Sequence, residues 1–408
     1  MDKNYKVLII DPFVSPRYLA LALKQENIVC DALYSAPPVE PSPYVDNADS
    51  LFDKILNTDS FDDGKITAAV LKGEYDFILN GAEEATYLTD QIASICLPTL
   101  SNDPLSSKLR VDKSEMNLAA ARAGLDTIRE CVIQAPFEEH DVCEAAAHVG
   151  LPVFCKPLYG YGGVGAFRAD TKLEILNRLN TPVPLQHQQY LVQKEIVGQE
   201  LLVDTFSARG VHHVCSVCRN PKEIISNQPV YRMTSVEEDP NMWSACANYV
   251  RGLLDAIGLM NGFAHTELFL EPDGTIRLIE LNNRISGGHG AVNKITTLCG
   301  LTSQVDALCQ FLRSGVVHTR PPHVRKGHAR NLVLFGFTAN GQEMFNDRIC
   351  SFSTVKEVIP LKTGKVTNGA AGYSLLDASS IIIMHSEDPA LIEEQTKGIF
   401  ALEQLARI

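Results

Sequence analysis

The sequence has no long hydrophobic run and no excess of positive charge. Its longest apolar stretches, such as SIIIM at 380–384, are far shorter than the roughly 20 residues of a membrane helix. The 408-residue chain has a formal net charge of −13, so no basic stripe offsets the acidic total. The short apolar stretches give no reason to expect a membrane segment. Because nucleic-acid binding depends on neutralising phosphates, the acidic total also argues against a nucleic-acid partner.

The cysteines do not form a secreted framework, although eleven are present. Their number is odd and their spacing is irregular, and MDKNYKVLIIDP lacks the basic region, apolar stretch and cleavage site of a signal peptide. These absences favour a cytoplasmic protein with reduced thiols. Cys215 and Cys218 lie on a predicted strand without a second ligand pair at zinc-finger spacing, so we interpret them as packing residues.

Several nucleotide-binding motifs are also missing. No G-x-x-x-x-G-K-[ST] sequence occurs, and the kinase motifs H-R-D and D-F-G are absent. The first predicted strand is followed by DPFVSPR rather than by the glycine motif of a dinucleotide-binding fold. These observations exclude a P-loop NTPase and disfavour NAD binding by the opening domain.

The chain is long enough for two to four domains, and its first part is organised as an α/β domain. The apolar runs KVLIID and IVCDALYS flank a segment with helical spacing, and YDFILNG precedes a further helix. We therefore predict a parallel sheet within residues 1–100. Later segments predict further helices at 113–124, 246–258 and 301–314, a strand pair at 263–282, and strands at NLVLFGF and SIIIMH.

The strand pair carries acidic and amide residues among apolar ones. In GFAHTELFLEPDGTIRLIELNNR, Asp273-Gly274 predicts a two-residue type I′ hairpin turn. That turn would place Glu267 opposite Glu280 and His265 opposite Asn282, on one face of the hairpin. Because like charges that face each other on a sheet are destabilising, a positive group is expected between the two glutamates.

A divalent cation is the favoured positive group. Two carboxylates and the Asn282 amide oxygen suit Mg²⁺ or Mn²⁺, with water or phosphate completing the coordination. Two alternatives remain open at this point: a carboxyl pair with a raised pKa, and a solvated surface hairpin.

A glycine-rich stretch follows the strand VFCKP. Gly160, Gly162 and Gly165 satisfy G-x-G-x-x-G, but the stretch leads into the short strand AFRAD rather than into a helix. Such a strand-loop-strand flap can cover nucleotide phosphates, because glycines let backbone N–H groups approach the oxygens. Lys156 and Lys113 are candidates to bind the same phosphates.

Five motifs in one order resemble those of the ATP-grasp ligases. They are Lys113 in DKSEM, VFCKPLYGYGGVGAF, VQKEIVGQELLVD, HTELFL and IELNNRISGG, and they cover roughly residues 1–315. The strand end with Glu280, Asn282, Arg284, Gly287 and Gly288 is most similar to that of carboxylate–amine ligases of the L-amino-acid ligase, or dipeptide synthetase, type.

The resemblance implies a mixed α/β and α+β architecture, the ATP-grasp fold. Its four parts would be an N-terminal Rossmann-like domain (1–112), a lid with the glycine flap (113–194), an antiparallel catalytic domain with the metal hairpin (195–315) and a C-terminal α+β lobe (316–408).

The resemblance also implies roles for individual residues. Lys113 and Lys156 would hold ATP phosphates, and the flap would contain Gly160, Gly162, Gly163 and Gly165. The backbone at Gln193 and Ile196 would bind adenine, Glu200 the ribose, and Glu267, Glu280 and Asn282 the Mg²⁺ or Mn²⁺ ion. Arg284 and Lys156 would act on the transferred phosphoryl group, and Arg232, His265, Gly287, Gly288 and His289 are candidates to contact substrate. Lys194 departs from the family, in which many members have an acid at that position.

The implied activity is ATP-dependent joining of a carboxylate to an amine, both small molecules such as amino acids. ATP would convert the carboxylate into an acyl phosphate, which the amine would attack, leaving ADP and phosphate. The family suggests a homodimer. The alternatives are a carboxylating or formylating ATP-grasp enzyme, a catalytically silent nucleotide-binding protein and, less favoured, an NAD-dependent enzyme.

Overall fold

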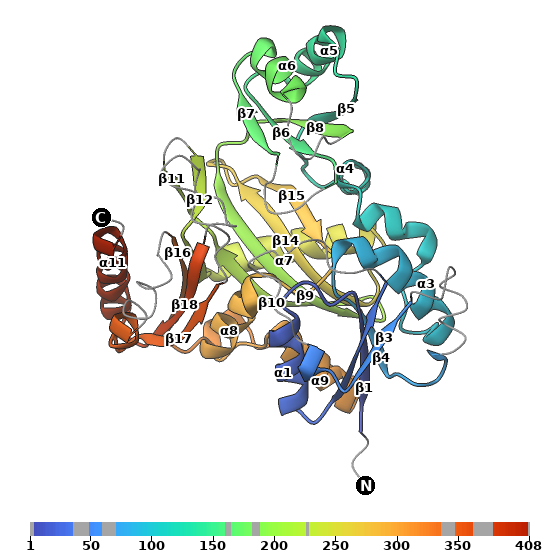
Figure 1. The fold of residues 1–408 in the computed structure, drawn as a ribbon, viewed down its shortest axis with the longest axis vertical. Coiled ribbons are helices and arrows are strands. Elements are labelled where there is room, and N and C mark those ends of the chain that lie inside the picture. Colours follow the sequence, from blue (N-terminus) through green and yellow to red (C-terminus); the bar gives the residue numbers. More distant parts are fainter. Residues whose placement is uncertain are drawn as a thin grey trace.

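Four β-sheets organise the computed structural model (Figure 1). The structure describes residues 4–35, 49–58, 71–159, 165–181, 188–225, 228–335, 347–361 and 378–406. All statements below concern these residues. Within them, no helix combines the length and apolar character needed to cross a membrane.

The N-terminal sheet is parallel, as predicted, with the strand order β3-β2-β1-β4. Alternate residues of β1 serve two cores: Val7 and Ile9 pack on the side of α1, and Leu8 and Ile10 pack on the side of α3. The elements are β1 (Lys6–Ile10), α1 (Pro16–Gln25), β2 (Val29–Tyr34), η1 (Asp49–Leu51), β3 (Lys54–Asn57), β4 (Phe77–Asn80), η2 (Glu83–Ala85) and α3 (Thr86–Cys96).

The connection to the lid runs through η3 (Pro104–Arg110) and α4 (Lys113–Arg122). The Asp112 side chain caps α4 by accepting hydrogen bonds from the N–H groups of Ser114 and Glu115. Gly124, with φ of 81°, follows the end of the helix as predicted. This cap places Lys113 at the first turn of α4.

The lid is an antiparallel sheet with the order β5-β8-β6-β7, and two helices cover its outer face (Figure 1). Thr171 and Glu174 form a capping box at the start of α6. The elements are β5 (Glu130–Gln134), α5 (Glu139–Val149), β6 (Val153–Pro157), β7 (Phe167–Ala169), α6 (Lys172–Asn180) and β8 (Gln189–Lys194).

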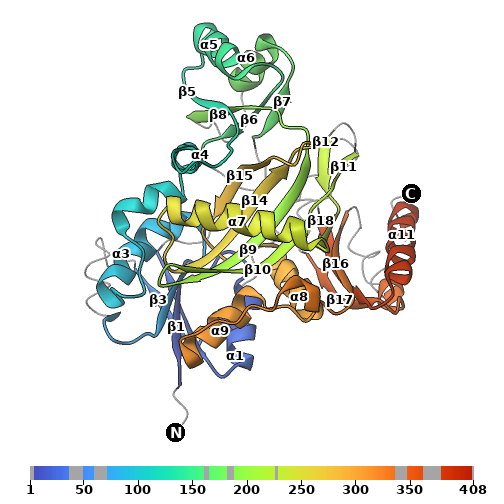
Figure 2. The same ribbon diagram turned by 180° about the vertical axis from the view of Figure 1, so that it is seen from behind.

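The largest sheet has eight strands in the order β15-β14-β9-β10-β13-β16-β18-β17. Figure 2 shows α7 lying across one face, and the apolar residues of α7 and α8 form one core with this sheet. Its elements up to residue 314 are β9 (Gln199–Ala208), β10 (Val211–Arg219), β13 (Met233–Val236), α7 (Pro240–Ala256), β14 (Gly262–Leu270), β15 (Ile276–Asn282), η4 (Gly288–Gly290), α8 (Ala291–Leu298) and α9 (Gln304–Ser314). A separate hairpin is formed by β11 (Lys222–Ile225) and β12 (Gln228–Tyr231).

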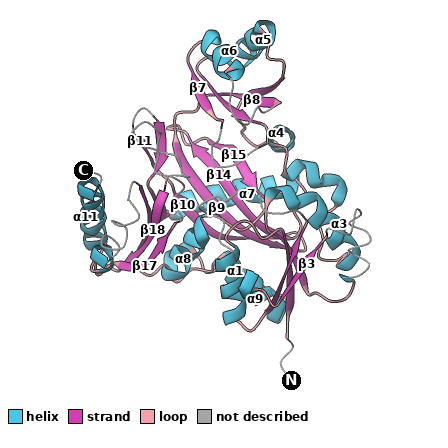
Figure 3. Cartoon of the chain, in the orientation of Figure 1, coloured by secondary structure: helices cyan, strands magenta, loops and turns pink. Residues whose placement is uncertain are grey.

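The C-terminal region extends this same sheet, because β16 pairs directly with β13. Figure 3 shows the last two strands of the region, β17 and β18, beside the long C-terminal helix α11. The region is packed against α11 through a separate apolar core. Its elements are η5 (Pro322–Val324), β16 (His328–Phe335), β17 (Val355–Pro360), β18 (Ala378–Ser386) and α11 (Pro389–Ala406).

Most predicted elements are confirmed, with three helices missed. Sequence periodicity did not identify α5, α8 or α11, and α7 begins six residues earlier than predicted because Asp239 caps it at Asn241. The eleven cysteines are free thiols, and Cys215 and Cys218 are buried packing residues as expected.

Candidate active site

The predicted pairing of the acidic hairpin is confirmed. Glu267 of β14 lies opposite Glu280 of β15, and His265 lies opposite Asn282. These four side chains therefore share one face of the central sheet. On the neighbouring strand β9, Asp204 pairs with His265 and extends the polar row.

The predicted turn of this hairpin is wrong, and a bulge compensates for the error. The loop has three residues, with Gly274 donating to the Glu271 carbonyl at 2.9 Å and taking a φ of 90°, so Leu270 pairs with Ile276. This register is one residue short of the predicted one. The extra residue Ile279 forms a β-bulge that restores the pairing of Glu267 with Glu280.

Two lysines from outside the central sheet converge on Glu280. The Nζ atoms of Lys113 and Lys156 each lie 3.7 Å from Glu280 Oε2. Lys156 also donates to the carbonyl oxygen of the bulged Ile279 at 3.1 Å. The structure thus joins α4, the lid strand β6 and the hairpin at one point, as a phosphate site requires.

The two paired glutamates have opposite electrostatic environments. Burial and the charge of Glu280 raise the pKa of Glu267 to about 7. Burial also acts to raise the pKa of Glu280, but the positive charges of Lys156, Lys113 and Arg284 outweigh it and lower that pKa. Burial lowers the pKa of Lys156, against the opposing effect of Glu280. On the β14 side, the charges of His265 and Lys222 oppose this rise in the pKa of Glu267 but do not outweigh burial and the neighbouring acids.

The donor set fits a hard divalent cation. Glu267 and Glu280 provide facing carboxylates, and Asn282 adds an amide oxygen beside them. A cation there would relieve the repulsion that raises the pKa of Glu267. In the described part of the chain, no group of three or more His, Cys, Asp or Glu side chains is arranged to hold a metal. Two carboxylates and one amide leave further coordination positions to water and phosphate oxygens.

His265 lies between two acids on the same face. Its Nδ1 is 2.7 Å from Asp204 Oδ1, and its Nε2 is 3.8 Å from Glu267 Oε1. Burial acts to lower the pKa of His265, but the charge and hydrogen bond of Asp204 outweigh it and raise that pKa. His265, a predicted substrate contact, therefore lies beside Glu267, one of the predicted cation ligands.

The predicted ribose acceptor Glu200 has a partner that sequence reasoning missed. Lys222, the first residue of β11, places Nζ 2.5 Å from Glu200 Oε2, and Asn220 donates to Glu200 Oε1 at 3.0 Å. Lys222 also lies over the Tyr231 ring, 4.6 Å from its centroid. No motif contains Lys222, so only the return of β11 toward β9 reveals this contact.

The residues predicted to bind adenine lie at the end of β8. Gln193 is the penultimate residue of that strand, and Ile196 follows in the connection to β9. Lys194 points elsewhere, since its Nζ donates to the Leu151 carbonyl at 2.9 Å. The lysine that stands where many family members have an acid therefore has its hydrogen-bond partner in the connection between α5 and β6.

The glycine flap lies largely outside the described residues. Gly160, Gly162 and Gly163 fall there, whereas Gly165 is described and has a φ of 77°. The flanking strands β6 and β7 pair antiparallel, which confirms the predicted strand-loop-strand arrangement. At its start, the Tyr159 hydroxyl donates to Asp112 Oδ2 at 2.9 Å, beside Lys113.

Arg284 is held by an acid from the N-terminal domain, which sequence reasoning also missed. Its Nη2 and Nε donate to the same oxygen, Glu83 Oε1, at 2.6 and 3.0 Å. Nearby, Asn80 Nδ2 donates to the Asn283 carbonyl at 2.7 Å. The stretch GAEEA, at the end of β4, is therefore part of the site.

The predicted glycines and His289 form the turn after β15. Ser15 of the N-terminal domain holds this turn, donating to the Ser286 carbonyl and accepting from Gly290 N–H at 2.9 and 3.1 Å. Gly288 and His289 have positive φ values of 62° and 54°, a conformation that costs a histidine more than a glycine. The turn is thus tied to the N-terminal domain.

Arg232 is placed differently from the other predicted site residues. Its guanidinium forms a bidentate ion pair with Glu403 of α11, and its Nη1 also donates to the Val333 carbonyl at 3.0 Å. The charge of Arg232 is therefore paired within the junction with the C-terminal region.

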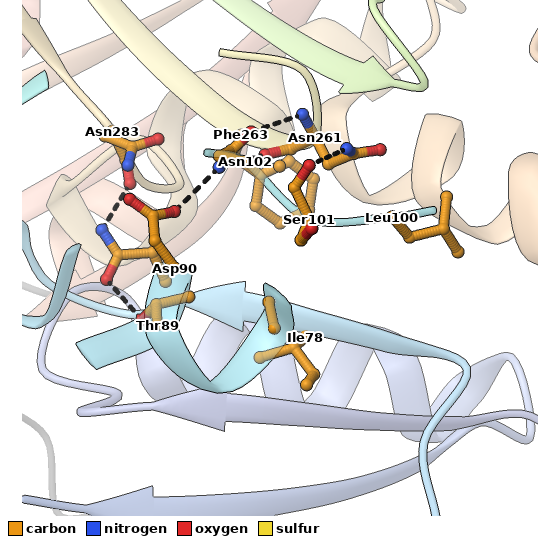
Figure 4. Close-up of a pocket in the computed structure, with 12 residues that line it drawn as sticks. Ile78, Thr89, Asp90, Leu100, Ser101, Asn102, Asn261, Phe263 and Asn283 are labelled. Carbon is orange, nitrogen blue, oxygen red and sulfur yellow. Dashed lines mark hydrogen bonds between the residues drawn. The ribbon is translucent and has the colours of Figure 1, made fainter. Parts of the chain in front are cut away.

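A buried polar junction lies directly behind the end of β15 (Figure 4). Asn102 donates to Asp90 Oδ1 and to the Asn261 carbonyl, each at 3.1 Å, and Asn261 donates to the Ser101 carbonyl at 2.9 Å. The small cavity, which Asn283 also lines, has a volume of about 10 Å³. That is space for one water molecule, so this junction supports the strand end and is no substrate pocket.

Comparison with known proteins identifies an ATP-grasp domain in the chain. A family model described as an ATP-grasp domain matches residues 149–293. A carbamoyl phosphate synthase large chain from Lachnoclostridium phytofermentans is 26% identical over 243 residues, which are 53% of this chain and 20% of that protein. The chain thus spans about a fifth of that relative. A D-alanine–D-alanine ligase from Streptococcus pyogenes serotype M49 is 22% identical over 265 residues, covering 61% of this chain and 72% of that protein.

Solved structures resemble the chain along nearly its whole length. An L-amino acid ligase from Bacillus licheniformis aligns with a TM-score of 0.70 at 18% identity, covering 98% of both chains. A carboxyaminoimidazole ribonucleotide synthase from Aspergillus clavatus aligns with a TM-score of 0.73 at 16% identity, covering 99% of both chains. At these identities the likeness shows the fold.

The predicted fold and cofactors are confirmed by these matches. The mixed architecture of a parallel sheet, a lid and a large antiparallel sheet is the ATP-grasp fold, and its cofactors are ATP with Mg²⁺ or Mn²⁺. The chain therefore contains an ATP-grasp domain, which the family model matches at residues 149–293.

Proposed function

We propose that the chain is an ATP-dependent, ADP-forming ligase that joins a small-molecule carboxylate to an amine. We further propose that both substrates are amino acids or acyl-amino acids, so that the product is a peptide bond. The observation that carries the proposal is the convergence of Lys113 and Lys156 on Glu280, each at 3.7 Å, beside the facing Glu267.

In the proposed reaction, different residues bind the nucleotide, hold the cation and stabilise the transferred phosphoryl group. Lys113 and Lys156 bind the phosphates of ATP, and Arg284 neutralises the phosphoryl group as it moves to the carboxylate. A divalent cation held by Glu267, Glu280 and Asn282 supplies positive charge to the same oxygens. The carboxylate becomes an acyl phosphate, and the amine then attacks the carbonyl carbon and displaces phosphate. Exclusion of water by the lid protects the acyl phosphate from hydrolysis.

The direct test is ADP formation across a matrix of amino-acid pairs, with hydroxylamine added to trap an acyl phosphate. We expect amine-dependent ADP formation with at least one pair, and a hydroxamate when hydroxylamine replaces the amine. A protein that binds ATP but forms no ADP with any pair would contradict the ligase proposal.

The second test uses two glutamates of one hairpin. Glu280→Gln should reduce turnover at least about 1,000-fold, because it removes a cation ligand and the partner of both lysines. Glu271→Gln is the matched control, since Glu271 lies at the turn and pairs with Arg277. Equal activity of the two variants would refute the role of the hairpin.

The likeness to a carboxyaminoimidazole ribonucleotide synthase supports a second candidate, a carboxylating ligase. Its acid substrate would be bicarbonate. ADP formation that depends on bicarbonate and an amine, without any amino acid as the carboxylate, would favour this alternative.

A further inference from the structure

Glu130 lies on the face of the lid sheet that looks onto the hairpin. It pairs with Gln193 of β8, and on the other side of β8 Gln193 pairs with Phe154 of β6. Lys156 lies two residues after Phe154 and therefore shares its face. Because Lys156 reaches Glu280, this is the face toward the proposed nucleotide site. The other face packs against α5 and α6.

A short hydrogen bond joins Glu130 to Gln193. Gln193 Nε2 donates to Glu130 Oε2 at 2.6 Å, and the Gln193 side chain is 5% exposed. Above its raised pKa of about 7, the Glu130 carboxyl is ionised and can only accept, so the amide nitrogen then faces Glu130. Since the amide group is planar, its oxygen is turned away from Glu130 and is presented as an acceptor.

The environment of Glu130 is unfavourable for an ionised acid. Burial raises the pKa of Glu130 to about 7, although hydrogen bonds from Gln193 and Asn117 and the charge of Lys156 oppose this. An apolar residue at this strand position would avoid that cost. None of the steps proposed above uses Glu130, so its carboxylate requires another explanation.

We propose that Glu130 is a positioning residue that fixes the amide oxygen of Gln193 toward the base and thereby selects a 6-amino purine over a 6-oxo purine. This inference rests on the proposed ATP-dependent function, and it adds a side-chain contact to the adenine contact predicted for the Gln193 backbone. The 6-amino group of adenine donates and matches the amide oxygen. A 6-oxo group accepts, so it would face another acceptor and lose the hydrogen bond.

The selection depends on the amide being held in one orientation. Without the carboxylate, the amide of Gln193 can rotate by half a turn and donate to a 6-oxo group. Glu130→Gln keeps the size of the side chain but can accept from or donate to Gln193, so both orientations become available.

The experiment compares binding of ATP and inosine triphosphate, with Mg²⁺, by calorimetry at about pH 8, where Glu130 is ionised because the pH lies above its raised pKa. These nucleotides differ only at the 6-position of the base and the adjacent ring proton. We expect the wild-type protein to bind ATP at least about ten-fold more tightly, and Glu130→Gln to narrow the ratio to about three-fold or less. Glu144→Gln, an exposed lid glutamate 71% accessible, is the matched control and should keep the wild-type ratio.

A double-mutant cycle tests whether Glu130 acts through Gln193. Gln193→Leu should also narrow the ratio, and adding Glu130→Gln to it should change the ratio no further. A wild-type ratio retained in a folded Glu130→Gln protein would overturn the inference. If Glu130→Gln does not fold, an unchanged ratio in Gln193→Leu overturns it. Wild-type protein that binds neither nucleotide would overturn the proposed function as well, which separates the two failures.

Discussion

The central sheet meets its neighbours through two arginine–glutamate pairs that differ in design. At the N-terminal junction, Arg284 places two nitrogens on a single oxygen of Glu83, and the two side chains are 11% and 22% exposed. At the C-terminal junction, Arg232 engages both oxygens of Glu403, and the side chains are 6% and 1% exposed. The first pair borders the hairpin, whereas the second is sealed within the fold.

The contacts around each pair explain the difference. Glu403 also accepts the Phe335 N–H at 2.6 Å, and Arg232 stacks on the Phe400 ring at 4.4 Å. Both oxygens of Glu403 and both Nη atoms of Arg232 are therefore engaged within the fold. Arg284 lies near Glu280 and lowers the pKa of that carboxyl. Under the proposed function we expect it to exchange Glu83 for a phosphate, whereas the Arg232 pair joins the C-terminal region to the rest of the fold.

The largest effect should follow from Arg284→Met. We expect turnover to fall about 1,000-fold or more, because the charge on the transferred phosphoryl group loses its partner. The free energy of unfolding should fall by about 1–2 kcal/mol, less than for the Arg232 pair, since Glu83 is 22% exposed and can still be solvated. ADP formation and urea denaturation measure the two quantities. Arg313→Met, which breaks an exposed pair with Glu26, is the control. A large loss of stability with normal turnover would show that Arg284, like Arg232, has a structural rather than a functional role.

The opposite result is expected for Arg232→Met. Removing this guanidinium leaves Glu403 buried without its counter-charge, which should cost about 3–5 kcal/mol of unfolding free energy. Activity per folded molecule should stay within about two-fold of wild type. Denaturation followed by active-site titration with ATP separates the two readouts. A selective loss of activity in a stable protein would instead indicate that Arg232 contacts substrate.

Removing both members of the sealed pair should restore much of the stability. Arg232→Met combined with Glu403→Leu replaces an ion pair by apolar groups of similar size, a change that is often neutral in buried sites. The Phe335 N–H loses its acceptor, so we expect a net loss of about 1–2 kcal/mol. If the double variant were as unstable as Arg232→Met alone, the pair would not be the cause of the instability.

The smallest effect should come from Glu83→Gln. This change removes the charge that competes for Arg284, so ATP should bind about three- to ten-fold more tightly, with little change in the melting temperature. Calorimetric titration with ATP and Mg²⁺ tests this expectation. Weaker ATP binding would indicate that Glu83 orients Arg284 for the phosphate rather than competing with it.

The hairpin shows how far local reasoning extends. The assumed two-residue turn predicted that Glu267 faces Glu280, and this pairing is found only because the bulge offsets a turn that was wrong by one residue. The bulge at Ile279 could not be read from the sequence, because any strand residue can be the extra one when the surrounding sheet requires it. The pairing of the two glutamates was therefore predicted from the turn, and the tertiary structure reaches the same pairing through a different turn and a bulge.

The partners of the charged groups were the part that sequence reasoning missed. Glu83 is 201 residues from Arg284, Glu403 is 171 residues from Arg232, and Glu130 is 63 residues from Gln193. Charged residues of either sign occur throughout the chain, and periodicity carries no information about which of them meet. The helix α11, which provides Glu403, was itself not predicted.

The sequence by itself determined the order of the motifs, the parallel opening sheet, the residues of the hairpin and the type of ligand that they suit, because these depend on local alternation and on side-chain chemistry. Only the tertiary structure decided that Lys113 and Lys156 meet at Glu280, that Arg284 is shared with Glu83, and that Arg232 belongs to the C-terminal junction. The physical reason is that local patterns set the face on which a side chain lies. The packing of domains sets which charges share that face.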